Sequence, residues 1–224
     1  MAILVQRSEL VPHRDRAEFE RRNESEAWPA LLRQGVQMVA AGRWAFGGPS
    51  DSLVSHLRFE SIDHLAAVDG TLVDGVGDGQ PVFTARMIEG DTPAESRQPG
   101  GEGWGPAELP PTFGRGSVVS ERIYQIETSH YAEFAELSKQ HVWPWLERAG
   151  GRLIAFGRDP FGTSEELITL FAFRSVRDWF QLSRPSSEQP PPDEVVAAWT
   201  RRSALIERHR GRLLVVTTGF GRPV

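Results

Sequence analysis

The order of apolar and polar residues along the chain predicts two successive units, each built as strand, helix, strand, strand, helix, strand. Apolar runs rich in β-branched residues predict strands in the first unit over residues 3–11, 36–46, 53–59 and 81–88. Apolar residues spaced three and four positions apart predict its helices over residues 15–33 and from residue 62 onward. The second unit is predicted to have strands over 118–126, 152–158, 167–173 and 213–218, and helices over 128–149, 176–182 and 193–211.

The first third of the chain recurs later in the sequence at a constant offset for about thirty residues. Ala17-Glu18-Phe19 matches Ala132-Glu133-Phe134, and Trp28-Pro29 matches Trp143-Pro144. The remaining matched pairs are Leu31 with Leu146, Arg33 with Arg148, Gly35 with Gly150, Gly42-Arg43 with Gly157-Arg158, and Phe46-Gly47 with Phe161-Gly162. After a slip of one residue, Phe173-Arg174-Ser175-Val176 aligns with Phe59-Glu60-Ser61-Ile62. A register kept over this length indicates an internal duplication.

Each predicted unit has the order βαββαβ, which is that of the ferredoxin-like fold. A sheet with one face in water should alternate sharply between apolar and polar residues, but the strand over 118–126 carries both kinds on both faces. We therefore expect both faces of each sheet to be covered. The predicted fold class is α+β, with two tandem ferredoxin-like units whose antiparallel sheets pack face to face as an intrachain α/β barrel. Residues 1–89 form the first unit, residues 90–116 a Gly- and Pro-rich linker, and residues 117–224 the second unit.

Proline interrupts the long helix of each unit at matching positions. Pro29 and Pro144 lie inside apolar helical patterns, where a proline removes a backbone donor and crowds the preceding turn. We expect a kink or break near His141 and at the equivalent place in the first unit.

Charge and cysteine content exclude several classes of protein. A net charge of −5 does not support a broad nucleic-acid-binding surface. The absence of cysteine excludes disulfides, thiolate nucleophiles and cysteine-ligated metals. No window reaches the roughly eighteen apolar residues of a membrane span, and the N-terminal residues do not resemble a signal peptide. We expect no membrane partner and a cytoplasmic location.

Matching strand positions carry the first candidates for a binding site. Arg7 and Arg122 are equivalent in the repeat, and Glu9 and Tyr124 share their strand faces. If that face lines a cavity between the sheets, these side chains form a donor-rich site for a carboxylate, enolate or phenolate. The alternative is an internal Arg–Glu pair that satisfies itself.

His141 is the candidate for acid–base chemistry. It lies seven residues after Phe134, on the buried stripe of its helix and beside the expected break. The alternative is a packed and hydrogen-bonded core histidine. Trp143 and other tryptophans of the chain could line an aromatic-binding cavity, although core packing also accounts for them. No spacing of histidines or carboxylates indicates a metal site.

Several short motifs of the second unit resemble the NIPSNAP family. They are Tyr124 before the helix, His141-Val142-Trp143-Pro144 within it, the run 151–158, and the run 166–175. The resemblance covers the second unit nearly end to end and the first unit more weakly. It implies a tandem member of the dimeric α/β-barrel superfamily, which includes cofactor-free monooxygenases, isomerases, cyclases and haem enzymes. Family members often carry a histidine on the third strand, where this chain has Thr169 and Ser55, with His56 displaced by one position.

These observations lead to a functional hypothesis with two alternatives. We expect a small-molecule enzyme of secondary or catabolic metabolism that acts without an organic cofactor on a hydrophobic, oxygenated substrate. Arg122, Arg7 and Tyr124 would stabilise an oxyanion in a cavity between the sheets, with Glu9 and Trp143 contributing to binding, and His141 would move the proton. The reaction would be an oxygenation, cyclisation or rearrangement. A non-catalytic binding or scaffold protein and a haem protein are the alternatives, and a homodimer is possible.

Overall fold

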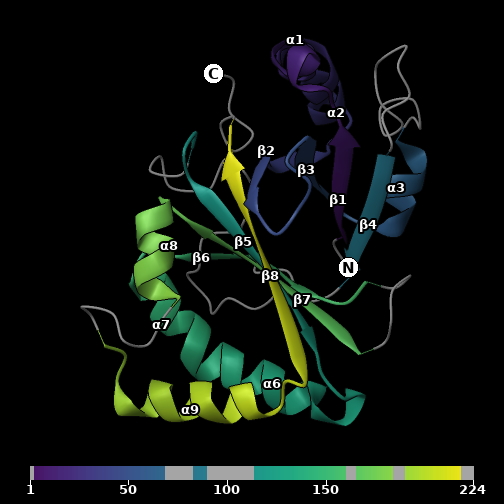
Figure 1. Cartoon of the computed structure of the whole chain (residues 1–224). Helices are drawn as coiled ribbons and strands as arrows, with labels where there is room; N and C mark the ends of the chain where they lie inside the picture. Colours follow the sequence, from purple (N-terminus) through teal and green to yellow (C-terminus); the bar gives the residue numbers. More distant parts are fainter. Residues whose placement is uncertain (1–2, 69–82, 90–113, 160–164, 184–189, 218–224) are drawn as a thin grey trace.

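The computed structural model of the protein (Figure 1) describes residues 3–68, 83–89, 114–159, 165–183 and 190–217. The first half consists of β1 (Ile3–Leu10), η1 (His13–Asp15), α1 (Arg16–Arg22), η2 (Asn23–Ala27), α2 (Trp28–Arg33), β2 (Gln37–Phe46), β3 (Ser52–Phe59), α3 (Ile62–Ala67) and β4 (Phe83–Glu89). The second half consists of β5 (Val118–Gln125), η3 (Thr128–His130), α6 (Tyr131–Leu137), η4 (Ser138–Val142), α7 (Trp143–Arg148), β6 (Arg152–Gly157), β7 (Glu166–Phe173), α8 (Val176–Leu182), α9 (Asp193–Ala204) and β8 (Arg208–Val216).

The strands pair as two ferredoxin-like units joined edge to edge. Within the described residues they form one eight-stranded sheet with the order β4-β1-β3-β2-β8-β5-β7-β6, and all pairs are antiparallel. The first four strands repeat the connectivity of the last four. Because β4 and β6 also lie against each other, the sheet curls into a barrel. The predicted fold class is therefore confirmed.

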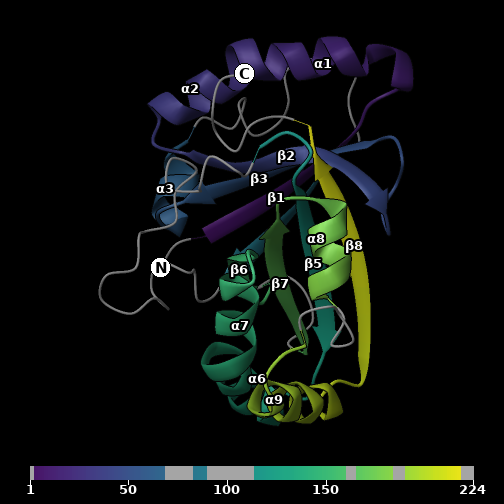
Figure 2. The same cartoon turned by 90° about the vertical axis from the view of Figure 1, so that its left-hand side faces the viewer.

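Helices cover the outer face of each half of the barrel. Figures 1 and 2 show α1 and α2 over the first unit's strands, and α6, α7 and α9 at the opposite end of the molecule. The two units join at the β2–β8 pair, where Gly42 stands opposite Val216. A Cβ atom on Gly42 would lie 2.0 Å from the carbonyl oxygen of Val215, so only glycine permits the strands to approach this closely.

The duplication extends to local irregularities. Each long helix widens into a π turn just before its proline, and the N–H groups of Trp28 and Trp143 donate to carbonyls five residues back, on Asn23 and Ser138. The interruption predicted from the prolines is thus present in both units. Register shifts in β2 and β6 also fall at matching positions, between Met38 and Ala40 and between Leu153 and Ala155. Ser61 and Ser175 cap the equivalent helices α3 and α8.

The interior of the barrel is packed with side chains from both units. Its apolar cluster is Leu4, Val39, Ala40, Trp44, Val54, Val119, Ile123, Ile154, Ala155, Ile168, Leu170, Ala172, Leu214 and Val216. A buried polar group crosses between the units, because Gln6 Nε2 donates to Glu121 Oε2 at 2.5 Å and lies 3.0 Å from His56 Nε2. His56 is 0% exposed and, as expected from its displaced position, faces away from Ser55. Side chains of this cluster and this polar group thus occupy the space between the sheets, where a binding cavity was predicted.

The C-terminal segment differs from its sequence-based prediction. The helix predicted to continue to residue 211 ends at Ala204, and β8 already begins at Arg208. Arg208 to Gly211 pair with β5, which gives these polar residues a strand conformation that their composition does not suggest. The domain boundaries and the linker over 90–116 lie largely outside the described residues and stay predictions. Within the described part of the chain, every helix lacks the length and apolar character required to cross a bilayer.

Candidate functional site

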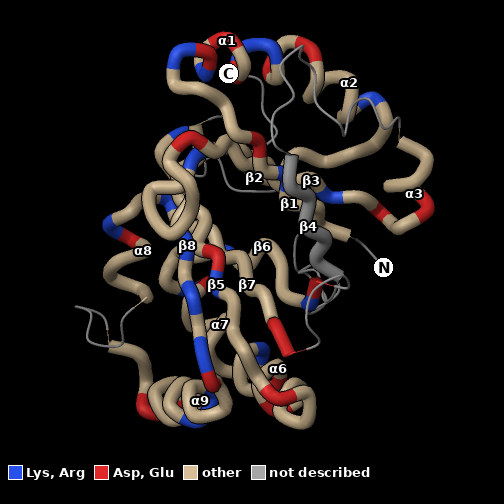
Figure 3. The backbone as a smooth tube through the Cα atoms, turned by 45° about the vertical axis from the view of Figure 1, so that its right-hand side comes forward, with Lys and Arg blue, Asp and Glu red and all other residues tan. Residues whose placement is uncertain are grey.

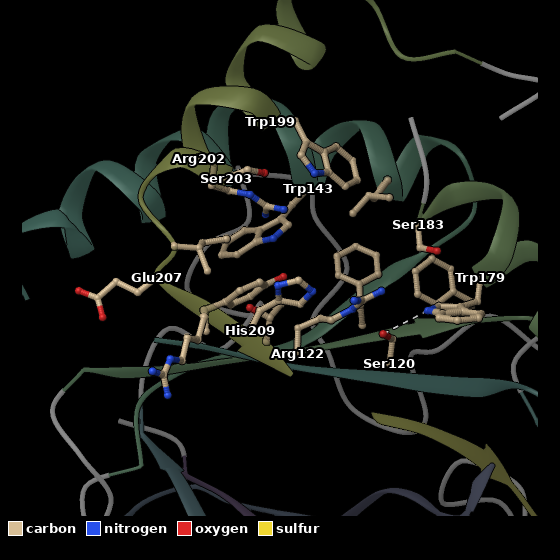
Figure 4. A pocket seen from close by; sticks show the side chains of 17 residues that line it. Ser120, Arg122, Trp143, Trp179, Ser183, Trp199, Arg202, Ser203, Glu207 and His209 are labelled. Carbon is tan, nitrogen blue, oxygen red and sulfur yellow. Dashed lines mark hydrogen bonds between the residues drawn. The ribbon is translucent and has the colours of Figure 1, made fainter. Parts of the chain in front are cut away.

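A pocket of about 420 Å³ lies between the outer face of the second unit's sheet and its helices. Its floor comes from β5, β7 and β8, and its walls come from α7, α8, α9 and the turn after α9 (Figure 4). The lining residues are Ser120, Arg122, Tyr124, Trp143, Leu146, Thr169, Phe171, Phe173, Trp179, Ser183, Trp199, Arg202, Ser203, Ile206, Glu207, Arg208 and His209. This volume is within the range of about 300–1,000 Å³ that small-molecule sites occupy.

Neighbouring strands place two polar pairs on the floor of the pocket. Arg122 and Tyr124 lie two positions apart on β5 and therefore share the outer face. Across the ladder, Gly211 stands opposite Arg122 and His209 stands opposite Tyr124. The Arg122 side chain extends over the glycine, because a Cβ atom there would be 3.3 Å from Arg122 Nη1. The sheet thus presents a guanidinium, a phenol and an imidazole to one space.

Helix α9 supplies a buried cation, Arg202. Its side chain is held among aromatic rings, with Cζ 5.2 Å from the centroid of Phe134, 5.3 Å from that of Trp199 and 6.0 Å from that of Tyr124. The residue is 6% exposed, and burial lowers the pKa of its guanidinium. An arginine nevertheless stays charged at any ordinary pH.

The described residues offer Arg202 no carboxylate partner. Its Nη1 donates to Ser138 Oγ at 3.4 Å, and its Nε has no hydrogen-bond partner. Ser138 Oγ in turn donates to the Phe134 carbonyl at 2.7 Å, a carbonyl that also accepts from the Ser138 backbone N–H. A buried, unneutralised cation costs several kcal/mol. An anion entering the pocket would remove that cost.

A second cation and a free hydroxyl reinforce this preference. The charge of Arg122 further lowers the pKa of Arg202, because the two guanidinium groups repel one another across the pocket. Thr169 Oγ1 is also buried without a hydrogen-bond partner, and Thr169 lines the same pocket. Figure 4 shows Arg122 and His209 reaching up from the sheet toward Trp143, Trp199 and Arg202 on the helices.

Aromatic side chains form much of the remaining wall of the pocket. Trp143 and Trp199 line the helix side, and Trp179 lies at the far end, where its Nε1 donates to Ser120 Oγ at 3.2 Å. Trp179 also contacts Phe46 of the first unit, with ring centroids 5.4 Å apart. Figure 3 shows further basic positions along β8, of which Arg208 lines the pocket mouth. The pocket is suited to a flat aromatic molecule that carries an anionic group.

The predicted site residues are divided between two places by the fold. Arg122, Tyr124 and Trp143 come together in this pocket, on the helix-covered side of the sheet and not between the sheets. Arg7 and Glu9 line a separate pocket of only about 20 Å³ in the first unit, where they form a buried ion pair. An ion pair between Arg7 and Glu9 is therefore present there, as in the alternative that the sequence left open. His141 lies in the π turn η4 and is not among the lining residues of either pocket.

Sequence reasoning missed Arg202, His209 and Trp179. Arg202 continues the apolar stripe of α9 formed by Val195 and Ala198, and a charge on such a stripe was a usable signal. His209 gave no signal, since its segment was expected to be helical.

The fold's known relatives were identified by structure. Neither a protein-family model nor a curated protein sequence matches the chain. The chain is similar to a "putative monooxygenase" from Lactobacillus acidophilus NCFM, with a TM-score of 0.65 and 9% identity over 97% of this chain and 94% of that one. It is also similar to an anthrone oxidase-like protein, with a TM-score of 0.54 and 12% identity over 96% and 91% of the two chains. At these identities the likeness shows the fold alone, that of a tandem dimeric α/β barrel.

NIPSNAP proteins are among the similar solved structures over part of the chain. One from Agrobacterium tumefaciens strain C58 is 24% identical, with a TM-score of 0.39, over 44% of this chain and 91% of its own. The solved structures similar to this chain thus include NIPSNAP family proteins as well as proteins named "putative monooxygenase".

A haem protein was one of the alternatives, and its axial ligand would have to come from Tyr124 or His209 among the lining residues. A haem iron needs an axial ligand from the protein. The third-strand position carries Thr169, and the one imidazole among the lining residues, that of His209, is exposed at the pocket mouth.

Proposed function

We propose that the pocket of the second unit binds an aromatic small molecule in its anionic form, and that the protein oxygenates this molecule with O₂ without an organic cofactor. The observation that carries the proposal is the buried guanidinium of Arg202, which lacks a carboxylate partner among the described residues and faces an aromatic-walled pocket. Such a cation stabilises a phenolate or enolate more than the neutral parent molecule. The site therefore favours ionisation of its ligand.

The lining residues supply the remaining parts of the reaction. His209 accepts the proton that the substrate loses, because it is the imidazole that lines the pocket. Arg122 and Arg202 hold the resulting oxyanion, and the tryptophans hold the ring system. The carbanion form of the substrate then gives its electrons to O₂. A methylene group becomes a carbonyl, one oxygen atom enters the product, and the other leaves as water with the two hydrogens.

Two relatives support this reaction class. One similar structure is named a "putative monooxygenase" and another anthrone oxidase-like, and both match over nearly the whole chain. An anthrone has an acidic methylene group opposite the ketone of its central ring, and its deprotonation gives an aromatic oxyanion. It therefore suits the charge and the walls of the pocket.

The binding step can be tested with two probes that differ only in charge. Tryptophan fluorescence of the protein should be quenched on titration with naphthalene-2-carboxylate, because Trp143, Trp179 and Trp199 line the pocket. Naphthalene-2-carboxamide has the same ring and no charge, and it should bind about tenfold or more weakly. Equal affinities would overturn the proposed anion preference.

The chemical step can be tested by oxygen uptake with anthrone as substrate. We expect consumption of one O₂ for each anthraquinone formed, and loss of that activity in Arg202→Met. Anion binding without oxygen uptake from anthrone or related acidic phenols would instead support the non-catalytic binding protein.

A further inference from the structure

The two pockets are copies of one site. Arg7, Trp28 and Ser55 line the small pocket of the first unit, and their repeat partners Arg122, Trp143 and Thr169 line the large pocket of the second unit. Both pockets lie between the outer face of a sheet and the helix that contains the π turn. Residues that differ between the two pockets are therefore the ones that changed after the duplication.

The copies differ most in their carboxylates. The first unit has Glu9 where the second has Tyr124, and Glu20 where the second has Ala135. Glu9 pairs with Arg7, and Glu20 accepts hydrogen bonds from Arg43 at 2.9 Å. Glu20 also accepts a hydrogen bond from Thr217 Oγ1 at 3.2 Å. Both carboxylates line the small pocket, so its cations are neutralised from within.

Neither carboxylate has a counterpart in the second unit. Tyr124 lies beside Arg122 on the same strand face, and its ring is part of the aromatic surround of Arg202. Ala135 is too small to reach across the space that Glu20 fills. The first pocket has a volume of about 20 Å³ and the second about 420 Å³. Loss of the internal carboxylates thus accompanies an open, cationic pocket.

We infer that Tyr124 is the residue that determines anion selectivity in the second unit, and that the first unit's pocket is a closed copy which binds no anion. An acidic residue at this position neutralises Arg122 from two positions away, as Glu9 does to Arg7. A tyrosine leaves the guanidinium available and adds an aromatic wall. The protein consequently binds one anion per chain, although it contains the site twice. This inference rests on the proposed anion binding.

The test uses a pair of variants that differ by one charge. Tyr124→Glu introduces the carboxylate of the first unit, and Tyr124→Gln introduces a neutral side chain of the same size. The probe is naphthalene-2-sulfonate, which stays ionised across the working pH range, and its affinity is measured by isothermal titration calorimetry. We expect one site per chain in the wild-type protein, and an affinity about tenfold or more weaker in Tyr124→Glu than in Tyr124→Gln. Equal affinities of the two variants would overturn the inference.

Further measurements distinguish three outcomes: a Tyr124→Glu variant that does not fold, an inference about Tyr124 that is wrong, and a protein that binds no anion. Ala135→Glu restores the other missing carboxylate and should also weaken sulfonate binding, which keeps the test valid if Tyr124→Glu does not fold. Glu9→Gln should leave the stoichiometry at one, whereas two sites per wild-type chain would contradict the closed copy. A wild-type protein that binds no sulfonate at all would refute the proposed function itself.

Discussion

Arg122 lies directly across the β5–β8 ladder from Gly211, and its guanidinium extends over the glycine's missing side chain. The arginine can adopt this position because a Cβ atom at residue 211 would stand only 3.3 Å from Nη1. The absence of a side chain at Gly211 thus helps to orient the Arg122 guanidinium into the pocket.

Gly211→Ala should displace the Arg122 guanidinium by a few tenths of an ångström without unfolding the sheet. We expect naphthalene-2-carboxylate to bind about threefold more weakly, with a larger loss in Gly211→Val. Binding of the uncharged carboxamide and the urea midpoint of unfolding serve as controls, and both should change little. A parallel loss for both probes would mean that the pocket's shape, and not the arginine, had been altered.

Arg202→Met should stabilise the protein while removing its anion preference. A buried charge without a carboxylate partner opposes folding, and an apolar side chain of similar length avoids that cost, so we expect a gain of about 1–4 kcal/mol in the free energy of unfolding. Affinity for naphthalene-2-carboxylate should fall about 100-fold. Both quantities follow from urea titrations and fluorescence titrations of the same sample.

Arg201→Met is the matched control for that variant. Arg201 is exposed, forms an ion pair with Glu133 at 2.6 Å on the surface of α6, and does not line the pocket. Its replacement should leave anion affinity unchanged. If Arg202→Met destabilised the protein instead, the guanidinium would have a structural partner that compensates its burial.

His209→Gln should lower the turnover number for anthrone by about 10²–10⁴-fold while changing the affinity for naphthalene-2-carboxylate little. The imidazole is assigned to proton transfer, and the arginines are assigned to binding, so the two parameters should separate. His141→Gln is the companion variant, since sequence reasoning placed the base there. Full activity of His209→Gln together with an inactive His141→Gln would return the role to His141.

Gly42→Ala should destabilise the junction of the two units. Its Cβ atom would meet the backbone carbonyl of Val215 at 2.0 Å, and backbone cannot rotate away as a side chain can. Overpacking of this kind costs about 1–3 kcal/mol or more, measurable as a lower midpoint in urea. Gly114→Ala is the control, because the structure places nothing within 4 Å of its Cβ. Equal effects of the two substitutions would show that the close approach at the junction is not maintained.

The buried pair in the first unit predicts a pH dependence of stability. Burial raises the pKa of Glu9 above its ordinary 4.5, and the nearby Arg7 only partly offsets this. The folded state therefore holds the proton more tightly than the unfolded state, so the contribution of Glu9 is largest below pH 4.5 and is lost as pH rises through the raised pKa. The difference in unfolding free energy between wild type and Glu9→Gln should fall across that window.

An exposed carboxylate provides the opposite sign for comparison. Hydrogen bonding to Arg21 lowers the pKa of Glu18, so the Glu18 contribution is present above the ordinary pKa and declines as pH falls. Urea titrations of Glu18→Gln over the same pH series should show no loss with rising pH. The same trend in both variants would indicate a general charge effect and not the burial of Glu9.

The sequence by itself determined the architecture, because strand and helix periods, the repeat and the placement of Pro29 and Pro144 are local properties. They led to two βαββαβ units, to covered sheets on both faces and to interrupted helices, all of which the structure shows. They also identified Arg122, Tyr124 and Trp143, which share one pocket. Residue type and strand face were sufficient for that grouping.

Only the tertiary structure decided which face of each sheet is the inner one. Both faces of a strand such as β5 are covered, so its pattern is the same whether Arg122 points into the barrel or toward the helices. The inner face proved to carry Glu121 and Ile123, and the pocket lies on the other side. The burial of Arg202 depends on how α9 packs against the rest of the unit. The position of His209 in the pocket depends on where β8 begins. Those contacts join residues far apart in the chain, and no local pattern records them.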